Sequence, residues 1–391
     1  GIISINVKFI ENLLYSIKGE MNLKKLRTSE MVLKGHPDKL CDHIADSILD
    51  DYLKHDAKAK VAVEVAISYR KVFILGEVTS SYVCDMEKIA REVIKNTGYV
   101  KPEYGFTYDQ VEVEINVNRQ SNDIAMGVLK DDMGAGDQGM MFGYATDETK
   151  EFMPLPYVLA RNLALRTDYV KEQNILSYLR PDGKMQVTVL YDDDIPVCVT
   201  DIVVSLQHDE IEIEQLRKDV KEKIVDVVIP SAYVNENTKY HINPTGRFVI
   251  GGPVGDTGLT GRKIIADTYG SFAHHGGGSF SGKDASKVDR TGAYFARFVA
   301  KNIVAMGFSK RCEIGISYAI GVSNPTSIMI DTFHTEKVPV EQIETWVKEN
   351  FDFRPKQMIE RLQLEKPIYE GLSYYGHFGK EGYSFEEIIK K

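Results

Sequence analysis

Segments that combine glycine with lysine, arginine or histidine are the parts of this sequence best suited to chemistry. They lie at residues 35–39 (GHPDK), 255–263 (GDTGLTGRK) and 276–284 (GGGSFSGKD). Glycine lets backbone N–H groups approach an anion closely, and the cationic side chains add positive charge. Two cations about 4 Å apart repel by on the order of 4 kcal/mol at an effective dielectric of 20. Several cationic loops in one chain therefore favour a polyanion bound between them.

The segment 35–39 has the features of a helix start. Pro37 suits the first helical turn, where its missing N–H would be unpaired in any case. The free N–H groups of a helix N-terminus attract anions, and His36 and Lys39 add donors. An alternative stays open, in which Asp38 only complements the helix dipole, an effect of about 0.3–1 kcal/mol.

The segment 276–284 contains the GxxxxGK pattern of a phosphate-binding loop. Asp284 stands where that loop needs Ser or Thr to hold Mg²⁺, and no clear strand precedes it, so an ordinary P-loop NTPase is disfavoured. Lys287 follows Lys283 by four residues, which predicts that both lie on one side of a helix. Asp289 is close enough in sequence to offer a carboxylate to a metal ion.

Two further pairs could bind a nucleotide, and each also has an ordinary structural explanation. Arg262 and Lys263 are either phosphate ligands or solvated surface cations. Phe248 could stack on a base with Arg247 beside it on a phosphate or ribose, although a single phenylalanine more often belongs to the core.

The acidic candidates are weaker when each is taken alone. The turns at 134–139 and 181–184 contain Asp, Gly and Pro, which turns commonly do. Glu64 and Glu77 lie in predicted strands, where glutamate is uncommon. Each either faces solvent or binds a cation or a substrate ammonium group.

The elements that must position these residues follow from hydrophobic periodicity. Val61, Val63, Val65 and Ile67 alternate with other residues, which predicts a strand with two different faces. The plan of two strands followed by a helix recurs twice, so we expect an α+β architecture with a weak threefold repeat. The strands are predicted near 61–67, 72–78, 185–191, 197–206, 314–322 and 327–332, with helices following near 86–97, 216–227 and 340–350.

Composition excludes several classes of protein. A chain of 391 residues with 43% hydrophobic and 27% charged residues is ordinary for a globular protein, not a disordered or fibrous one. Its net charge of −9 argues against a dedicated nucleic-acid binder, and no apolar run reaches the ~20 residues of a membrane span. The four cysteines lie far apart without metal-binding spacing, which favours a reducing cytoplasm. Residues 1–22 are predicted to be an N-terminal extension or a remnant.

Taken together, the motifs resemble those of the methionine adenosyltransferase (S-adenosylmethionine synthetase) family, from about Thr28 to the C-terminus. The most specific are GHPDK at 35–39, GAGDQG at 134–139, INPTGRFVIGGP at 242–253, GDTGLTGRKII at 255–265 and HGGGSFSGKDASKVDR at 275–290. The resemblance implies that the methionine sulfur attacks C5′ of ATP, giving S-adenosylmethionine, and that the departing tripolyphosphate is hydrolysed to phosphate and diphosphate.

The resemblance also implies roles for individual residues. The catalytic residues would be His36, Lys184, Arg262 and Lys283. ATP would be bound by His36, Asp182, Gly183, Lys184, Arg247, Phe248, Asp256, Arg262, Lys263, Ser279 and Lys283. L-methionine would be bound by Glu77, Gln120, Asp137, Asp256 and Lys287. Magnesium would be held by Asp38, Asp289 and Glu30, and potassium by Glu64.

At the level of the whole molecule, the resemblance implies three interleaved domains related by pseudo-threefold symmetry, each a mostly antiparallel sheet with helices on one face. We expect these domains at 23–123, 134–250 and 251–391. Two Mg²⁺ and one K⁺ are expected in each active site. The active sites would lie between the subunits of a homodimer, which can pair into a tetramer.

The sequence departs from the family pattern at several positions. Lys34 stands where glutamate is usual, which reverses a charge beside the expected phosphate site. The lid segment at 120–134 is shorter than in many members. Two other functions stay open: a phosphohydrolase that releases ADP from the same pocket, and a regulatory subunit that binds nucleotide without turnover.

Overall fold

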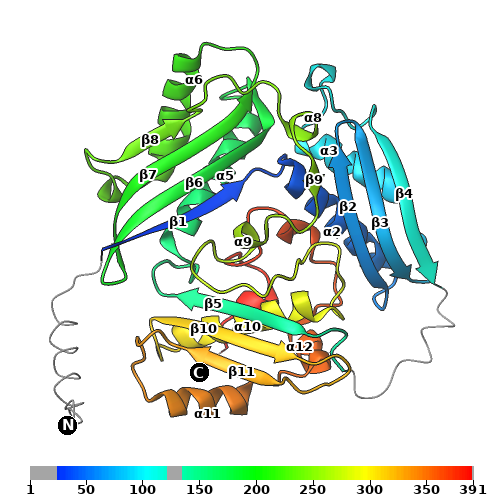
Figure 1. Ribbon diagram of the computed structural model, residues 1–391, viewed down its shortest axis with the longest axis vertical. Helices are drawn as coiled ribbons and strands as arrows, with labels where there is room; N and C mark the ends of the chain where they lie inside the picture. The colour runs from blue at the N-terminus through cyan, green and yellow to red at the C-terminus, as the bar shows by residue number, and fades with distance from the viewer. Residues whose placement is uncertain (1–23, 121–133, 390–391) are drawn as a thin grey trace, which may run out of the picture.

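The computed structural model describes residues 24–120 and 134–389, which form three β-sheets around a shared centre (Figure 1). The first sheet has the order β1 (Lys25–Val32), β6 (Leu179–Asp192), β7 (Ile195–His208), β8 (Lys239–Ile242). Its pairs are antiparallel except β7 with β8, which run parallel. Helix α5 (Leu155–Glu172) packs on β1 and β6. Helix α6 (Ile213–Val220) continues through a π-helical turn (Lys221–Val225) into α7 (Asp226–Val228).

The second sheet has the order β4 (Glu112–Gln120), β3 (Lys71–Thr79), β2 (Lys60–Ser68), β9 (Gly258–Leu259). Strands β3 and β4 run parallel, and the other pairs are antiparallel. Every second residue of β2 is buried, as the alternation predicts. The buried face lies against α2 (Pro37–His55), and α3 (Met86–Thr97) packs on α2 in turn.

The third sheet is antiparallel, with the order β11 (Ser327–Asp331), β10 (Arg311–Tyr318), β5 (Gly139–Thr146). Helix α10 (Val288–Ala305) packs on β5 and β10, and α12 (Pro355–Leu362) packs on α10. Helix α11 (Val340–Asn350) follows β11 in the chain. The short helices are α8 (Gly252–Gly255), α9 (Ile264–Asp267) and the 3-10 turns Pro102–Tyr104, Ser231–Tyr233, Glu370–Leu372 and Ser384–Glu386.

The three units exchange strands, which makes the fold interleaved. Strand β1 leaves the N-terminal part of the chain to pair with β6, and β9 returns from far along the chain to pair with β2. Strand β5 pairs with β10 across more than 150 residues. The expected α+β class, with mostly antiparallel sheets, is confirmed.

Three local predictions are wrong. The segment 181–184 is not a free turn, because it lies inside β6, where the register against β7 shifts between Leu179 and Gly183. The strand predicted to 322 ends at Tyr318. Lys283 is not helical, because α10 begins only at Val288, so it shares no helix side with Lys287.

The segment after α12 crosses the centre of the molecule, close to α2 and α10 (Figure 1). Most of its aromatic side chains are buried, including Tyr369, Phe378 and Phe385. Within residues 24–120 and 134–389, no helix is both long and apolar enough to cross a bilayer.

Candidate active site

The glycine-rich segment between α9 and α10 is seated on β2 and on the start of α10. The amide of Val63 donates to the Gly282 carbonyl at 3.0 Å, and Ala62 forms an isolated bridge with Lys283. The Lys283 Nζ lies 2.6 Å from Asp289 Oδ2, in the first turn of α10. The two residues predicted to hold phosphate and metal therefore meet, although their helix geometry differs from the prediction.

Lys287 has a separate partner. Its Nζ donates to Asp284 Oδ2 at 2.6 Å, and the same oxygen accepts the Val61 N–H at 2.7 Å. Burial would raise the pKa of Asp284, but Lys287 and Lys60 hold it below its usual value. Asp284, which stands where a P-loop would have Ser or Thr, thus attaches the glycine-rich segment to β2.

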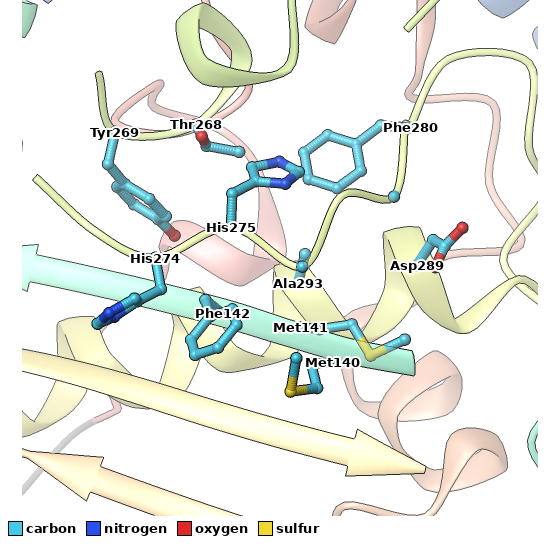
Figure 2. Close-up of a pocket in the computed structure, with 12 residues that line it drawn as sticks. Met140, Met141, Phe142, Thr268, Tyr269, His274, His275, Phe280, Asp289 and Ala293 are labelled. Atoms are coloured by element: carbon cyan, nitrogen blue, oxygen red, sulfur yellow. The ribbon is translucent and has the colours of Figure 1, made fainter. Parts of the chain in front are cut away.

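A narrow cavity lies behind the glycines (Figure 2). His275 lines it next to Phe280, and Asp289 lies at its end. The Gly277 N–H donates to His275 Nδ1 at 2.8 Å. Burial lowers the pKa of His275, so the neutral ring can keep accepting this hydrogen bond. His275 lies inside a recognised motif, yet sequence reasoning gave it no role.

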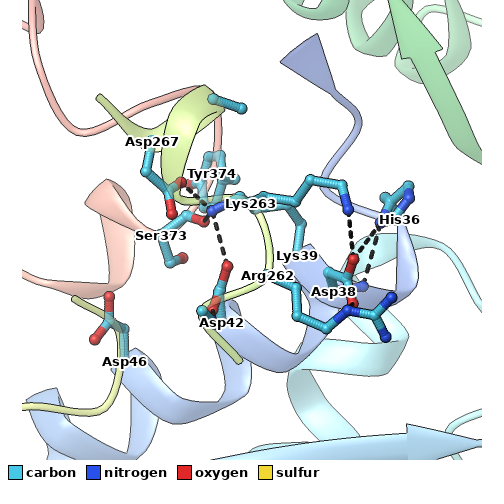
Figure 3. A network of polar contacts seen from close by, with 12 residues as sticks. His36, Asp38, Lys39, Asp42, Asp46, Arg262, Lys263, Asp267, Ser373 and Tyr374 are labelled. Carbon is cyan, nitrogen blue, oxygen red and sulfur yellow. Dashed lines mark hydrogen bonds and ion pairs between the residues drawn. The ribbon is translucent and has the colours of Figure 1, made fainter. Parts of the chain in front are cut away.

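The second group of candidates surrounds the first turn of α2 (Figure 3). Pro37 occupies the start of the helix as predicted, and the Asp38 N–H donates to His36 Nδ1 at 3.2 Å. Asp38 Oδ2 accepts from Lys263 Nζ at 2.5 Å, and Arg262 Nε lies 3.7 Å from Oδ1. Asp38 therefore does more than complement the helix dipole, because it forms a buried ion pair with Lys263, whereas the Arg262 side chain is half-exposed.

The electrostatics of this group follow from burial and neighbouring cations. Burial, reinforced by Lys263 and Lys184, lowers the pKa of His36 to about 3. Burial would raise the pKa of Asp38, but the hydrogen bonds from Lys263 and the Leu259 N–H hold it below its usual value. At neutral pH His36 is uncharged and Asp38 is ionised.

The start of β6 lies beside this helix terminus. A Cβ on Gly35 would lie 2.4 Å from the carbonyl oxygen of Pro181, so the two segments are in direct contact. Asp182 is buried, accepts the Gly252 N–H at 2.9 Å, and has its pKa raised by burial to about 6. After Gly183, the exposed side chain of Lys184 lies opposite Val32 in the strand register.

Arg247 and Phe248 lie in the segment that joins β8 to α8. Arg247 is exposed and its Nε lies 3.0 Å from Glu210 Oε1. The Phe248 N–H donates to His208 Nε2 at 3.0 Å, and its ring contacts Gly251 so closely that a Cβ there would lie 2.7 Å away. Phe248 is half-buried and stands outside the hydrophobic core cluster.

The remaining candidates are more dispersed. Glu64 on β2 is half-buried and accepts a hydrogen bond from the Thr260 hydroxyl. Glu77 on β3 is exposed, and Glu30 on β1 is half-buried opposite Gln186. The loop residues Asp137 and Asp256 are exposed, and each accepts the N–H of the residue that follows it. Ser279 contacts Gly261. The Gln120 side chain lies outside the described residues.

Lys34 turns away from the first turn of α2. Its Nζ lies 3.2 Å from Glu172 Oε1 and 3.5 Å from Asp168 Oδ2, both on α5. The reversed charge is therefore paired with carboxylates of α5.

Metal binding would depend on the substrate as well as the protein. Among the described residues, no three histidine, cysteine or carboxylate side chains gather as a complete cage. Mg²⁺ is commonly held by one or two carboxylates together with substrate phosphates. Asp38 and Asp289, each already beside a cation, fit that kind of shared site.

Comparison with protein families matches nearly the whole chain. Residues 24–122 match the model described as "S-adenosylmethionine synthetase, N-terminal domain". Residues 132–248 match the central domain of the same enzyme, and residues 250–387 match its C-terminal domain. All three domain models occur in their natural order.

Proposed function

Because the chain belongs to the S-adenosylmethionine synthetase family and is a methionine adenosyltransferase, we propose that the two groups of residues described above hold ATP and L-methionine for direct attack of sulfur on C5′. The observation that carries this proposal is the meeting of remote segments at the first turn of α2, where Asp38, Arg262 and Lys263 are in contact.

The chemistry demands positioning and charge neutralisation more than proton transfer. The methionine thioether is a neutral nucleophile with no proton to remove, so the first step needs no general base. The S–C5′ bond forms as the C5′–O bond breaks, and the electron pair leaves with tripolyphosphate. Cations placed along the departing chain stabilise this charge as it develops. Water then cleaves the tripolyphosphate to phosphate and diphosphate.

His36 would act as a neutral hydrogen-bond donor near the ribose–triphosphate junction. Its Nδ1 accepts the Asp38 N–H, and its pKa of about 3 keeps the ring uncharged. The ring proton must then be on Nε2, which can donate to a ligand oxygen. Lys184, Arg262, Lys263 and Lys283 would bind the phosphates, with Asp182, Gly183, Asp256 and Ser279 around them, and Phe248 would stack on adenine with Arg247 at its side.

L-methionine would be held by side chains of both charges. Its ammonium and carboxylate groups suit Glu77, Asp137, Asp256 and Lys287, with Gln120 nearby. The exposure of Glu77, Asp137 and Asp256 supports this assignment, because a substrate can reach them.

Two magnesium ions and one potassium ion are proposed for each site. Asp38, Asp289 and Glu30 would hold magnesium, and Glu64 would hold potassium. When bound, these cations supply positive charge to the polyphosphate. The half-buried carboxylate of Glu64, close to the Lys283 loop on the same strand, supports its assignment.

A homodimer with its active sites between the subunits is also proposed, with pairing into a tetramer as a further step. Among the described residues, no hydrogen bond or ion pair joins the group around Asp38 to the Lys283–Asp289 pair, so a partner could bring complementary halves together. Apolar side chains are exposed on the sheets, including Leu75, Ile115 and Met329. Such side chains suit an interface between proteins. The free thiols support a reducing compartment, the cytoplasm.

The test is a product analysis. The protein is incubated with ATP, L-methionine, Mg²⁺ and K⁺, with arms that omit each component, and the products are identified by mass. We expect S-adenosylmethionine with equal amounts of phosphate and diphosphate, and lower rates without either cation. Release of ADP would indicate a phosphohydrolase, and ATP binding without products would indicate an inactive subunit. The variant Asp289→Asn should lose turnover while its melting temperature stays close to wild type; near-normal turnover would remove Asp289 from the metal role.

A further inference from the structure

Helix α2 carries a buried row of aspartates, one in each successive turn. Asp38, Asp42, Asp46 and Asp50 recur every four residues, which places them on one side of the helix. Their exposed fractions are only 2%, 0%, 0% and 4%. Like charges at this spacing destabilise a helix. The row therefore needs an explanation beyond the stability of α2 itself.

Asp42 holds the loop that carries two of the phosphate-site cations. Its Oδ1 accepts the Gly261 N–H at 2.9 Å, directly before Arg262 and Lys263. Its Oδ2 accepts from Lys39 Nζ at 2.9 Å. Lys39 also donates to Asp267, so its charge is shared between two carboxylates.

Asp46 does the same for the glycine-rich segment one helical turn further along. Its Oδ1 accepts the Gly282 N–H at 2.9 Å, directly before Lys283. Arg290 pairs with both carboxylate oxygens at 2.7 and 2.8 Å and donates to the Lys283 carbonyl at 3.2 Å. Each aspartate thus binds the amide of a glycine that precedes a cation, while a buried cation neutralises it.

Both loops need glycine at the position whose amide contacts α2. Gly261 has φ +72° and Gly282 has φ +81°, a region that favours glycine. A Cβ on Gly261 would lie 2.4 Å from the Ser279 Cβ, and one on Gly282 would lie 1.9 Å from the Val63 carbonyl oxygen. The contact of each loop with α2 therefore fixes the direction of the glycine N–H. It also fixes the point from which the following cationic side chain begins.

We propose that Asp42 and Asp46 are positioning residues that fix Arg262 and Lys263, and Lys283, respectively, against successive turns of α2, so that each loop presents its cations to the triphosphate that it binds in one geometry. This inference rests on the proposed function, because it assumes that these cations bind the phosphates. Neither aspartate touches the substrate. Each acts through the backbone of the following cation, and its buried counter-ion keeps the row from repelling the polyanion.

The first experiment compares Asp42→Ala with Asp50→Ala in the full chain. Asp50 is the matched control because it belongs to the same buried row and accepts the amides of Tyr369 and Glu370, which are not part of the proposed site. A displacement near 1 Å can cost up to about 100-fold in rate. We expect Asp42→Ala to lower kcat/KM for ATP by about 10- to 100-fold per folded molecule and to weaken tripolyphosphate binding. Asp50→Ala should lower the melting temperature while kcat/KM changes less than threefold.

The second experiment is a double-mutant cycle with Arg262→Ala, which separates positioning from general loss of stability. Once Arg262 is truncated, Asp42→Ala should lower kcat/KM by a smaller factor than it does in the wild type, with displacement of Lys263 accounting for the remainder, while its effect on melting temperature stays additive. Equal fold losses with and without Arg262, or an Asp50→Ala loss as large as that of Asp42→Ala, would overturn the proposal. Should Asp42→Ala not fold, Asp42→Asn tests the same idea from the other side: it keeps an oxygen for the Gly261 N–H, so kcat/KM for ATP should fall less than threefold although the ion pair with Lys39 is lost, and a loss of tenfold or more would overturn the proposal. Failure of the wild type to form S-adenosylmethionine would instead refute the proposed function, and tripolyphosphate binding would still test the positioning.

Discussion

His36 shows how strongly the surroundings of one residue control its chemistry. The residue is 4% exposed, and its ring lies near Lys263 and Lys184 and accepts an N–H from the helix that it caps. A protonated ring could not accept that hydrogen bond, and it would add a charge where two lysines already repel it. The residue is therefore suited to donate a hydrogen bond without changing charge.

A pH titration of stability tests this state of His36. The folded pKa of about 3 lies below the ordinary 6.5, so the unfolded chain binds more protons between these values. Stability from this group is present above pH 6.5 and is lost as the pH falls toward 3. For the apo protein, His36→Asn should remove about 2 kcal/mol of the stability change between pH 7 and pH 5. Urea unfolding at both pH values, at equal protein concentration, measures this difference, and an identical pH dependence in the two proteins would contradict it.

Lys34 provides a second residue-scale prediction. Its ammonium lies near Asp168, whose side chain is 9% exposed, and near the exposed Glu172. Lys34→Glu would place three carboxylates together and should reduce stability by about 1–3 kcal/mol. Because the side chain points to α5, kcat/KM for ATP should change little in the folded protein. Lys34→Met serves as the control that removes the charge without reversing it, and a large kcat/KM loss in both variants would return Lys34 to the phosphate site.

At the scale of elements, the position of each loop in the candidate site is fixed by the strands and helices that it contacts. The glycine-rich segment is fixed by β2 on one side and by α2 on the other, through Gly282. Gly277, in the same segment, also has a positive φ of +91° but has open space around it. Replacing each glycine by alanine therefore separates the free-energy cost of backbone conformation from the cost of a steric clash.

Gly277→Ala should cost about 1–2 kcal/mol of unfolding free energy from backbone conformation alone. Gly282→Ala meets the same cost and must also displace the loop from the Val63 carbonyl, so we expect a further loss of about 1–3 kcal/mol. Chemical denaturation of the two variants measures the difference. Equal losses would mean that the loop can shift without breaking its contact with β2.

The sequence allowed the locally determined elements to be predicted, because their signals are short-range. The alternation in β2 and the stop at Gly98 after α3 are both readable within a few residues. Residues 181–184 look like a turn for the same reason, yet β1 and β7 pair on either side and draw them into β6. The contact of Asp42 with Gly261 joins residues 219 apart, so no local pattern reveals it. The four-residue spacing of the aspartates was the one signal that could have pointed to it.

At the scale of the whole molecule, buried ion pairs join distant parts of the chain. Glu386 accepts from Arg297 at 2.9 Å and from Lys301 at 2.8 Å, which fixes the C-terminal segment on α10. Removing one partner of a buried pair leaves an uncompensated charge and typically costs 3–5 kcal/mol. The protein as a whole therefore depends on contacts made by residues near 386.

Glu386→Gln should lower the unfolding free energy by about 3–5 kcal/mol, since Arg297 and Lys301 would remain buried without a counter-charge. Glu365→Gln is the matched control, because Glu365 pairs with the exposed Lys58 at 2.7 Å on the surface. Such surface pairs contribute at most about 1 kcal/mol. Denaturation curves of the two variants should differ clearly, and similar midpoints would show that the C-terminal segment is not anchored through Glu386.

The contact between Asp50 and the Tyr369 amide has a consequence for how the protein is made. These residues are 319 positions apart. A ribosome adds roughly 5–20 residues per second, so Asp50 waits about 15–60 s for its partner to be synthesised. Until then α2 carries unpaired aspartates beside an unfinished centre, and the N-terminal third cannot reach its final packing on its own. The packing around Asp50 is therefore completed only after Tyr369 and Glu370 have been synthesised.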